Sequence, residues 1–266
     1  MEEKKLILQA SDISIVFGGL RAVSEFNAEI YKGELVGLIG PNGAGKTTVF
    51  NMLSGVYTPT EGQISFWDRK GNVNIVNKKT PAQLNKIGIA RTFQNIRLFG
   101  NLTVADNVKI AMHSSRKAGI FSILFRLPKY RREEGMITER VRQLLKLFGL
   151  EKKENEFAKN LPYGEQRKLE ICRALASNPQ LLLLDEPAAG MNPQETKELM
   201  DLIAFIRKEF RLTILLIEHD MKLVMGICER VIVLNYGRIL AVGKPEEILK
   251  NPEVVKAYLG SEAEVM

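Results

Sequence analysis

The chain has 266 residues, of which 45% are hydrophobic and 26% are charged, a composition typical of globular proteins and not of disordered or fibrous ones. Lysine and arginine number 38 against 31 aspartates and glutamates, giving a net charge of +7. This positive balance suits phosphate ligands, anionic membranes or nucleic acid, and it does not choose among them. The length accommodates one α/β core with a subsidiary lobe, or two separate domains.

Signals for secretion and for membrane insertion are missing from the sequence. The first residues, M-E-E-K-K-L-I-L-Q, contain no apolar core of a signal peptide, and no stretch approaches about 18 uncharged apolar residues. We therefore expect a cytosolic protein that reaches a membrane only through a partner. The two cysteines, Cys172 and Cys228, each lie in an apolar helical pattern without a partner at metal-ligand spacing, which predicts buried, reduced thiols.

Two kinds of apolar pattern predict two kinds of β-strand. Between residues 6 and 30 the apolar residues alternate, as in Ile13, Ile15 and Phe17, which favours antiparallel strands with one face in solvent. Continuous apolar blocks follow at residues 35–39, 181–184, 214–217 and 231–234. Such blocks, separated mostly by helical patterns, are typical of parallel strands covered by helices on both faces.

A helical segment interrupts this α/β pattern. Residues 102–178 contain no comparable strand block, and their apolar residues follow a helical period at Val141, Leu144, Leu145, Leu147 and Phe148 and at Leu169, Ile171, Cys172 and Leu175. We expect a helical lobe inserted into the α/β core.

Residues 113–134, within the helical lobe, combine an apolar cluster with flanking basic residues. The cluster spans residues 120–127, and Arg116, Lys117, Arg126, Lys129, Arg131 and Arg132 surround it. An amphipathic element on a membrane surface, a docking site for a partner, or a helical hairpin packed on the lobe all fit this pattern.

Residues 40–47, G-P-N-G-A-G-K-T, match the phosphate-binding loop G-x-x-x-x-G-K-[ST] in full. A strand block precedes the loop and a helical pattern follows it, as the motif requires. Glycine lets backbone N–H groups approach a polyphosphate, Lys46 would contact the β- and γ-phosphates, and Thr47 would bind Mg²⁺. The expected nucleotide-binding residues are Gly40, Pro41, Asn42, Gly43, Ala44, Gly45, Lys46, Thr47 and Thr48.

Acidic residues and a histidine follow two of the buried strand blocks. Asp185 and Glu186 end the block that begins at residue 181, where two carboxylates are costly unless a cation or a reacting group uses them. Asp185 would hold Mg²⁺ and Glu186 would polarise an attacking water, although both could instead serve the helix that starts near Pro193. His219 follows the block at 214–217 and is placed to donate to a γ-phosphate, or to make a structural hydrogen bond.

This ordered set of motifs resembles the nucleotide-binding subunits of ATP-binding cassette (ABC) transporters along nearly the whole chain. The resemblance implies that residues 40–47 are Walker A and that Asp185 and Glu186 end Walker B. It makes Gln94 the Q-loop residue, His219 the switch histidine and Phe17 the aromatic that stacks on adenine. It thus assigns catalysis to Glu186, His219 and Gln94, and Mg²⁺ to Thr47, Gln94 and Asp185.

The family's signature sequence, L-S-G-G-Q, aligns with a divergent segment of this chain. Leu161 is followed by Pro162, Tyr163, Gly164 and Glu165, which the resemblance places against the ATP of a partner cassette. Because Pro162 has neither a hydroxyl nor an N–H, a homodimer would contain two weakened sites. We therefore expect a second, different cassette as partner, although a homodimer remains possible if Gly164 and the helix dipole suffice.

A narrower resemblance is to the LivG-type ATPases of branched-chain amino acid importers. It rests on R-T-F-Q at residues 91–94, E-P-A-A-G-M-N-P at 186–193, the insertion after His113, and V-V-K-A-Y-L-G at 254–260. A related cassette serves lipopolysaccharide export, but it is usually shorter after the Q-loop and keeps the signature serine. Both differences favour the importer.

The resemblance implies a single ABC ATPase domain over residues 1–266. Its α/β core, with a mostly parallel sheet and an antiparallel N-terminal β subdomain, would span 1–95 and 179–245. The helical subdomain would span 96–178 and a C-terminal helical tail 246–266.

The implied activity is ATP hydrolysis with Mg²⁺, coupled to transport by membrane permease subunits at the cytoplasmic face of the membrane. A substrate-binding protein outside the membrane would act indirectly, and nucleic acid is not expected as a partner. A soluble ATPase acting on nucleic acid or ribosomes is the alternative from another class, but the chain has neither a long coiled coil nor two cassettes. A GTPase is disfavoured because the guanine motif N-K-x-D is absent from the sequence.

Overall fold

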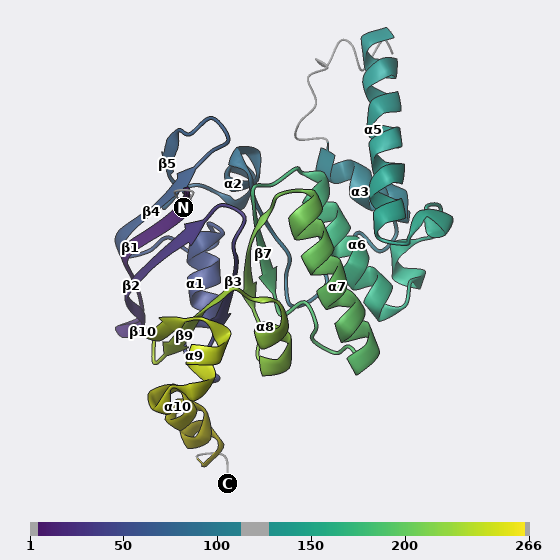
Figure 1. Cartoon of the computed structure of the whole chain (residues 1–266). Helices are drawn as coiled ribbons and strands as arrows, with labels where there is room; N and C mark the ends of the chain where they lie inside the picture. Colours follow the sequence, from purple (N-terminus) through teal and green to yellow (C-terminus); the bar gives the residue numbers. More distant parts are fainter. Residues whose placement is uncertain (1–4, 113–127, 264–266) are drawn as a thin grey trace. The chain divides into compact units, whose positions relative to one another are not determined.

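The computed structural model describes residues 5–112 and 128–263. The chain forms two compact units, of which unit 1 comprises Met1–Gln94 and Gln180–Met266 and unit 2 comprises Asn95–Pro179. Unit 2 is inserted between two strands of unit 1 and consists of helices in its described part (Figure 1). The predicted α/β class with an inserted helical lobe is confirmed.

The first sheet of unit 1 is antiparallel, and two of its four strands lie in the alternating part of the sequence. It contains β1 (Leu6–Phe17), β2 (Leu20–Tyr31), β4 (Glu61–Trp67) and β5 (Val73–Ile75) in the order β2-β1-β4-β5. Ile13, Ile15 and Phe26 are buried, whereas Phe17 and Leu20 are exposed. The expected antiparallel pair with one solvent-facing side is therefore confirmed.

The second sheet of unit 1 has the order β10-β9-β3-β8-β7-β6. Its strands are β3 (Leu35–Ile39), β6 (Ile89–Arg91), β7 (Leu181–Asp185), β8 (Thr213–Ile217), β9 (Arg230–Asn235) and β10 (Arg238–Gly243). All pairs are parallel except β9 with β10, and every residue of β3, β7 and β8 is buried. The four apolar blocks thus form the parallel strands that were predicted from them, while strands β4, β5, β6 and β10 were not anticipated.

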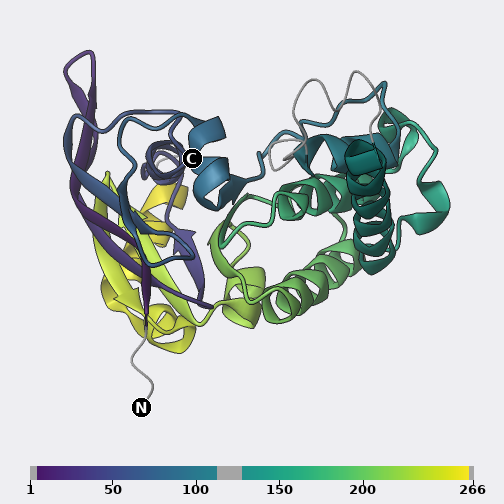
Figure 2. The same ribbon diagram turned by 90° about the horizontal axis from the view of Figure 1, so that it is seen from above.

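Helices of unit 1 pack around these sheets. They are α1 (Lys46–Leu53), α2 (Pro81–Ile87), α7 (Pro193–Glu209), α8 (Met221–Ile227), α9 (Pro245–Lys250) and α10 (Pro252–Ala263). The apolar face of α1 belongs to one core cluster with buried residues of both sheets. Strands β2 and β10 lie side by side (Figure 2), where the Ser24 N–H donates to the Gly237 carbonyl at 2.9 Å. The sheets and α1 therefore form one hydrophobic core.

Unit 2 contains α3 (Val104–Met112), α5 (Pro128–Leu147), α6 (Tyr163–Ala176) and the 3-10 turns η2 (Glu151–Lys153) and η3 (Ala158–Asn160). The predicted core positions of α5 and α6 are buried with one exception, Leu147, which is 37% exposed. Val141, Leu144, Leu145 and Phe148 follow the i, i+3, i+4, i+7 stripe, and Leu147 lies outside it.

The amphipathic element predicted at residues 113–134 lies mostly outside the described residues, since these resume at Pro128 with α5. Near its end, Glu134 on α5 forms an ion pair with Lys109 on α3. Within the described ranges, none of the helices combines the length and the apolar character that crossing a bilayer requires.

Both cysteines are free and buried, as predicted. Burial raises the pKa of the Cys172 thiol and raises that of Cys228 to about 12. Both side chains therefore serve as small apolar residues of the core.

The turn between β3 and α1 depends on glycine for two different reasons. Gly40 has φ 153°, and a Cβ there would lie 2.2 Å from the Leu234 carbonyl oxygen of β9. Gly43 has φ 78°, but a Cβ there would meet open space. Gly40 is therefore required by close backbone packing, whereas Gly43 is required only by its left-handed conformation.

We expect Gly40→Ala and Gly43→Ala to differ in their effect on stability. The Gly40 variant should lose about 3 kcal/mol of unfolding free energy, because a backbone must move, while the Gly43 variant should lose about 1 kcal/mol from strain alone. Urea unfolding of both variants, without nucleotide, measures the difference. Equal losses would contradict the packing role of Gly40.

Candidate functional site

The candidate residues of unit 1 lie where adjacent parallel strands end. Strand β3 leads into the loop of residues 40–45, β7 ends at Asp185, β8 leads to His219, and β6 leads to Gln94. These strands are neighbours in the order β3-β8-β7-β6 and run in the same direction. Their carboxyl ends therefore bring motifs far apart in the chain to one edge of the sheet.

The lysine of the phosphate-binding loop is buried at the start of α1. Lys46 Nζ donates to the carbonyl oxygens of Gly40 and Pro41 at 2.7 and 2.9 Å, and the residue is only 8% exposed. Burial lowers the pKa of Lys46, and the negative charge of Glu186 opposes this shift. A phosphate would supply the counter-charge that this desolvated ammonium lacks.

The remaining loop residues leave the N-terminus of α1 accessible. Gly45 is the N-cap of α1 in the left-handed conformation and makes no side-chain cap. Asn42, Gly43 and Thr47 are exposed, whereas Ala44 is buried, and Pro41 and Thr48 are half-buried. The first N–H groups of the helix are thus available to an anion, which the helix dipole also attracts.

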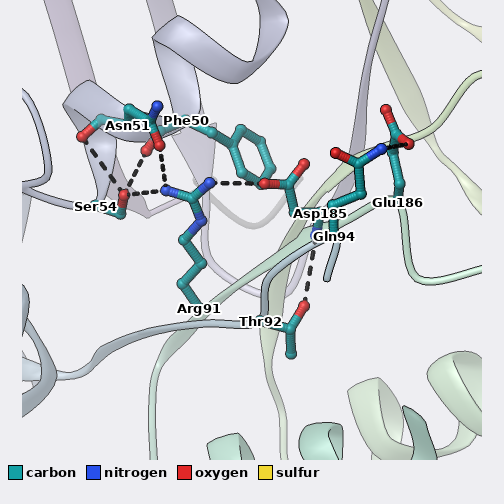
Figure 3. A network of polar contacts seen from close by, with 8 residues as sticks. All are labelled: Phe50, Asn51, Ser54, Arg91, Thr92, Gln94, Asp185 and Glu186. Atoms are coloured by element: carbon teal, nitrogen blue, oxygen red, sulfur yellow. Dashed lines mark hydrogen bonds and ion pairs between the residues drawn. The ribbon is translucent and has the colours of Figure 1, made fainter. Parts of the chain in front are cut away.

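The catalytic candidates Glu186, Gln94 and His219 converge. Gln94 Nε2 donates to Glu186 Oε2 at 2.7 Å (Figure 3), and His219 Nδ1 lies 3.8 Å from the same oxygen. The Glu186 side chain is 17% exposed and that of His219 is 62% exposed. Three segments separated in sequence therefore meet at one carboxylate.

Glu186 adopts an unusual backbone conformation for a residue with a side chain. Its φ is 44°, in the left-handed region, which costs on the order of 1 to 3 kcal/mol for residues other than glycine. Its N–H donates to the carbonyl of Ile217, the last residue of β8, at 3.0 Å. The neighbouring strand thus holds the strained turn that aims this carboxylate.

Asp185, the other acidic candidate, is the last residue of β7, and its side chain is 5% exposed. Its Oδ2 accepts a hydrogen bond from Arg91 Nη2 at 2.6 Å (Figure 3). The sequence singled out Arg91 only as part of R-T-F-Q, because pairing with a residue 94 positions away leaves no local signal.

The adenine candidate, Phe17, lies at the end of β1 and is 42% exposed. Its ring meets that of Tyr57 edge to face, with centroids 5.2 Å apart and planes at 69°. Tyr57 follows α1 and was not anticipated, since a single aromatic in a loop carries no pattern. An exposed Phe17 ring held by a second aromatic is suited to stack on a base.

A buried glutamate beside His219 is a further residue that the sequence did not reveal. Glu218 is 1% exposed, and its Oε1 accepts from the Ala188 N–H at 2.9 Å. Burial raises the pKa of Glu218, and the hydrogen bond from Ala188 opposes this shift. Glu218 thus joins the end of β8 to the segment that follows Glu186.

The C-terminal helix also reaches the phosphate-binding loop. The hydroxyl of Tyr258 in α10 is buried, and burial raises the pKa of Tyr258 to about 12, while the nearby backbone of Gly40 opposes this shift. The sequence linked residues 254–260 to a subfamily but gave no contact for Tyr258. Burial of this hydroxyl at Gly40 connects the tail to the loop.

The signature segment lies in unit 2, at the start of α6. Pro162 is the N-cap and makes no side-chain cap, so it stands just before the helix and not within the first turn. Tyr163 is 45% exposed and its hydroxyl accepts from Arg167 at 3.1 Å, Gly164 is buried, and Glu165 pairs with Lys153 at 2.6 Å. The N–H groups of the first turn are therefore not capped by a side chain.

We expect Glu218→Gln to stabilise the protein at neutral pH. Because the folded-state pKa of Glu218 is raised, its contribution to stability is full below the usual value near 4.5 and is lost as the pH rises through the raised pKa. A pKa that is higher by one in the folded state corresponds to about 1.4 kcal/mol of unfolding free energy. Urea unfolding between pH 4 and pH 8 should give equal unfolding free energies for the variant and the parent at acid pH. As the pH rises, the unfolding free energy of the variant should increasingly exceed that of the parent. A gain independent of pH would contradict this assignment.

Comparison with known proteins gives the family. The family model described as "ABC transporter" matches residues 23–189, and one described as "Branched-chain amino acid ATP-binding cassette transporter" matches residues 238–264. The chain is 49% identical to the high-affinity branched-chain amino acid transport ATP-binding protein LivG of Escherichia coli K12, over 96% of this chain and 98% of LivG. It is 45% identical to BraF of Pseudomonas aeruginosa, with the same coverage.

Solved structures agree with these relatives. The ADP conformation of MJ1267, an ATP-binding cassette of an ABC transporter, matches with a TM-score of 0.81 and 29% identity, covering 96% of this chain and 99% of that one. A nucleotide-free ATP-binding cassette from an ABC transporter matches with a TM-score of 0.80 and 28% identity, covering 95% of this chain and 98% of that one. The chain therefore belongs to the ABC transporter family of ATP-binding cassettes, in which it is similar to the LivG proteins.

Proposed function

We propose that this protein is the ATP-hydrolysing subunit of an ABC importer for branched-chain amino acids. The observation that carries the proposal is the similarity to LivG over nearly the full length of both chains, together with the meeting of Glu186, Gln94 and His219 in one site. The match of residues 238–264 to a family model of branched-chain amino acid cassettes supports the importer over a lipopolysaccharide exporter. The whole chain acts as one ATPase domain in this proposal.

Nucleotide binding uses the loop of residues 40–48 and the ring of Phe17. The phosphates replace the Gly40 and Pro41 carbonyls as partners of Lys46, and N–H groups at the start of α1 donate to the phosphate oxygens. Phe17, held by Tyr57, stacks on the adenine. This arrangement binds ATP through contacts that the loop already positions.

The residues near the strand ends fit Mg²⁺ by the chemistry of their donors. Thr47, Gln94 and Asp185 offer hydroxyl, amide and carboxylate oxygens, which this cation prefers. In the part of the chain that the structure describes, His, Cys, Asp and Glu do not form a group of three or more that could hold a metal. When bound, Mg²⁺ would neutralise charge that develops on the phosphates.

Hydrolysis depends on the carboxylate of Glu186. The strained turn and Gln94 orient this group, which accepts a proton from the attacking water as general base. His219 is close enough to the same carboxylate to share in positioning the γ-phosphate. Gln94 is the last residue of the first segment of unit 1, directly before unit 2. When nucleotide binds, Gln94 exchanges its hydrogen bond with Glu186 for another partner, and this exchange couples ATP binding to unit 2.

The partners are membrane permease subunits at the cytoplasmic face and a second, different cassette. In the resulting pair, the first turn of α6, with Pro162, Tyr163, Gly164 and Glu165, faces the ATP of the other subunit. Pro162 offers no hydroxyl to a phosphate, so the site completed by this segment is weaker than the other one. A substrate-binding protein delivers the amino acid outside the membrane without contacting this chain, and nucleic acid is not a partner.

Replacing the general base tests the proposed activity. In the complete transporter, Glu186→Gln should lower ATP turnover and leucine uptake by roughly 10²-fold or more, because the amide cannot accept the proton of water. ATP binding should remain, since Lys46 and the loop are unchanged. Turnover, uptake of labelled leucine and nucleotide binding are measured in proteoliposomes.

Glu61→Gln is the matched control, because this exposed carboxylate pairs with Arg21 outside the site. It should keep turnover and uptake at the parent level. Parent-level hydrolysis by Glu186→Gln would refute the assignment of the base, and ATPase activity without leucine uptake by the parent would refute the substrate.

The divergent signature predicts an asymmetric pair. The isolated protein should hydrolyse ATP slowly, and a second cassette with an intact signature, added with the permease, should increase its turnover. Pro162→Ser should raise the turnover of the isolated protein by roughly tenfold, since a hydrogen bond to phosphate contributes about 1.5 kcal/mol or more.

Pro81→Ser, at the first position of α2, is the control and should leave turnover unchanged. Purification of the tagged protein from its own membranes should recover the permease and the second cassette. Cooperative turnover of the isolated parent, without stimulation by a partner cassette, would contradict the asymmetric pair.

A further inference from the structure

Arg91 is a residue of R-T-F-Q to which the proposed function gives no role. It ends strand β6, and its side chain is 8% exposed. A buried guanidinium so close to a candidate catalytic centre needs partners for its charge. Figure 3 shows that these partners come from two other elements, β7 and α1.

The two ends of the guanidinium bind different elements. Nη2 donates to Asp185 Oδ2 at 2.6 Å, whereas Nη1 donates to Asn51 Oδ1 and to Ser54 Oγ, both at 2.7 Å (Figure 3). Asn51 lies in α1 and Ser54 is the C-cap of this helix. Arg91 therefore connects the last residue of β7 to the C-terminal end of α1.

Neighbouring groups fix the guanidinium in this position. Its Cζ lies 5.7 Å from the ring centroid of Phe50 and 5.0 Å from that of Phe93. Ser54 Oγ in turn donates to the Phe50 carbonyl at 2.7 Å. An arginine held by aromatic rings and by hydrogen bonds at both ends has little freedom to change its geometry.

The connection matters because α1 begins with the residues that contact phosphate. Lys46 and Thr47 form its first turn, so the helix bears the phosphate-binding loop at one end and the contacts of Arg91 at the other. The ion pair uses Asp185 Oδ2 and leaves Oδ1 outside it. The Asp185 N–H also donates to Thr92 Oγ1, at 3.5 Å, so residues 91 and 92 hold both the backbone and the carboxylate of Asp185.

We propose that Arg91 is a positioning residue that orients the carboxylate of Asp185 toward the Mg²⁺ of bound nucleotide and ties it to the phosphate-binding helix. This inference rests on the proposed function. Its physical basis is the two-ended geometry of the guanidinium, which a point charge cannot reproduce. Groups that orient a metal ligand typically change metal affinity by about 10- to 100-fold when they are removed.

The experiment separates nucleotide binding from the contribution of Mg²⁺. The melting temperature is measured with ADP and EDTA, and again with ADP and increasing Mg²⁺, for the parent, Arg91→Gln and Arg91→Lys. For Arg91→Gln, the shift with ADP and EDTA should stay close to the parent, because Lys46 and the loop are intact. The Mg²⁺ concentration that gives half of the additional shift should rise by roughly tenfold or more.

Arg91→Lys distinguishes orientation from charge. Lysine keeps the positive charge beside Asp185 but cannot bind Asp185 and Asn51 together, so its Mg²⁺ requirement should also rise. A Mg²⁺ requirement equal to that of the parent in Arg91→Lys would overturn the geometric argument. If a variant loses the increase in melting temperature with ADP and EDTA to the same extent as the further increase with Mg²⁺, Arg91 has a structural role alone.

Two further variants keep the test decisive if Arg91→Gln folds poorly. Asn51→Ala removes one of the two hydrogen bonds from Arg91 to the C-terminal end of α1 without leaving Asp185 unpaired, and it should raise the Mg²⁺ requirement in the same direction. When Arg91→Gln is combined with Asp185→Asn, it should have no additional effect on the Mg²⁺ requirement, because Arg91 acts through Asp185. An additional effect of the full size would contradict the proposal.

Arg230→Lys is the matched control. Arg230 makes a two-pronged ion pair with Glu34 at 2.8 Å for both contacts, in the same sheet but away from the candidate site. Its Mg²⁺ requirement should equal that of the parent. If the parent itself shows no shift with ADP, the proposed function fails, whereas a parent shift with unaltered Mg²⁺ dependence in the Arg91 variants refutes only this inference.

Discussion

The parallel pairing of β3, β8, β7 and β6 is the constraint on which the candidate site depends. Because neighbouring strands point the same way, each one delivers its following residues to one edge of the sheet. The loop before Lys46, the pair Asp185 and Glu186, and His219 owe their proximity to this pairing. Continuous apolar runs enforce it, since strands buried on both faces have no solvent-exposed side on which to place polar residues.

The parts of this arrangement that have a local signature could be predicted from the sequence. The loop of residues 40–47 has a fixed spacing, and the strand blocks have a distinctive apolar run. The helical period located α5 and α6 but included Leu147, which a strict stripe excludes. Strands of three residues, such as β5 and β6, are too short to show a period.

Side-chain contacts between distant segments could not be predicted in this way. Arg91 reaches Asn51 and Asp185, Glu218 reaches Ala188, and Tyr258 reaches Gly40. Each of these contacts joins elements whose arrangement in the fold must be known first. Glu186 adds a different case, because a left-handed φ at a glutamate contradicts local preference and is maintained by the surrounding strands.

The insertion of unit 2 also governs the order in which the sheet can be completed. Strands β6 and β7 are direct neighbours, with Ile89 opposite Leu181, yet all of unit 2 lies between them in the chain. During synthesis β6 therefore leaves the ribosome long before its neighbour and remains an unpaired edge. Early folding of unit 2 around its own core would bring the two strands together and shorten the loop that must close. An insert that has folded first would thus lower the entropic cost of assembling the edge that carries the candidate site.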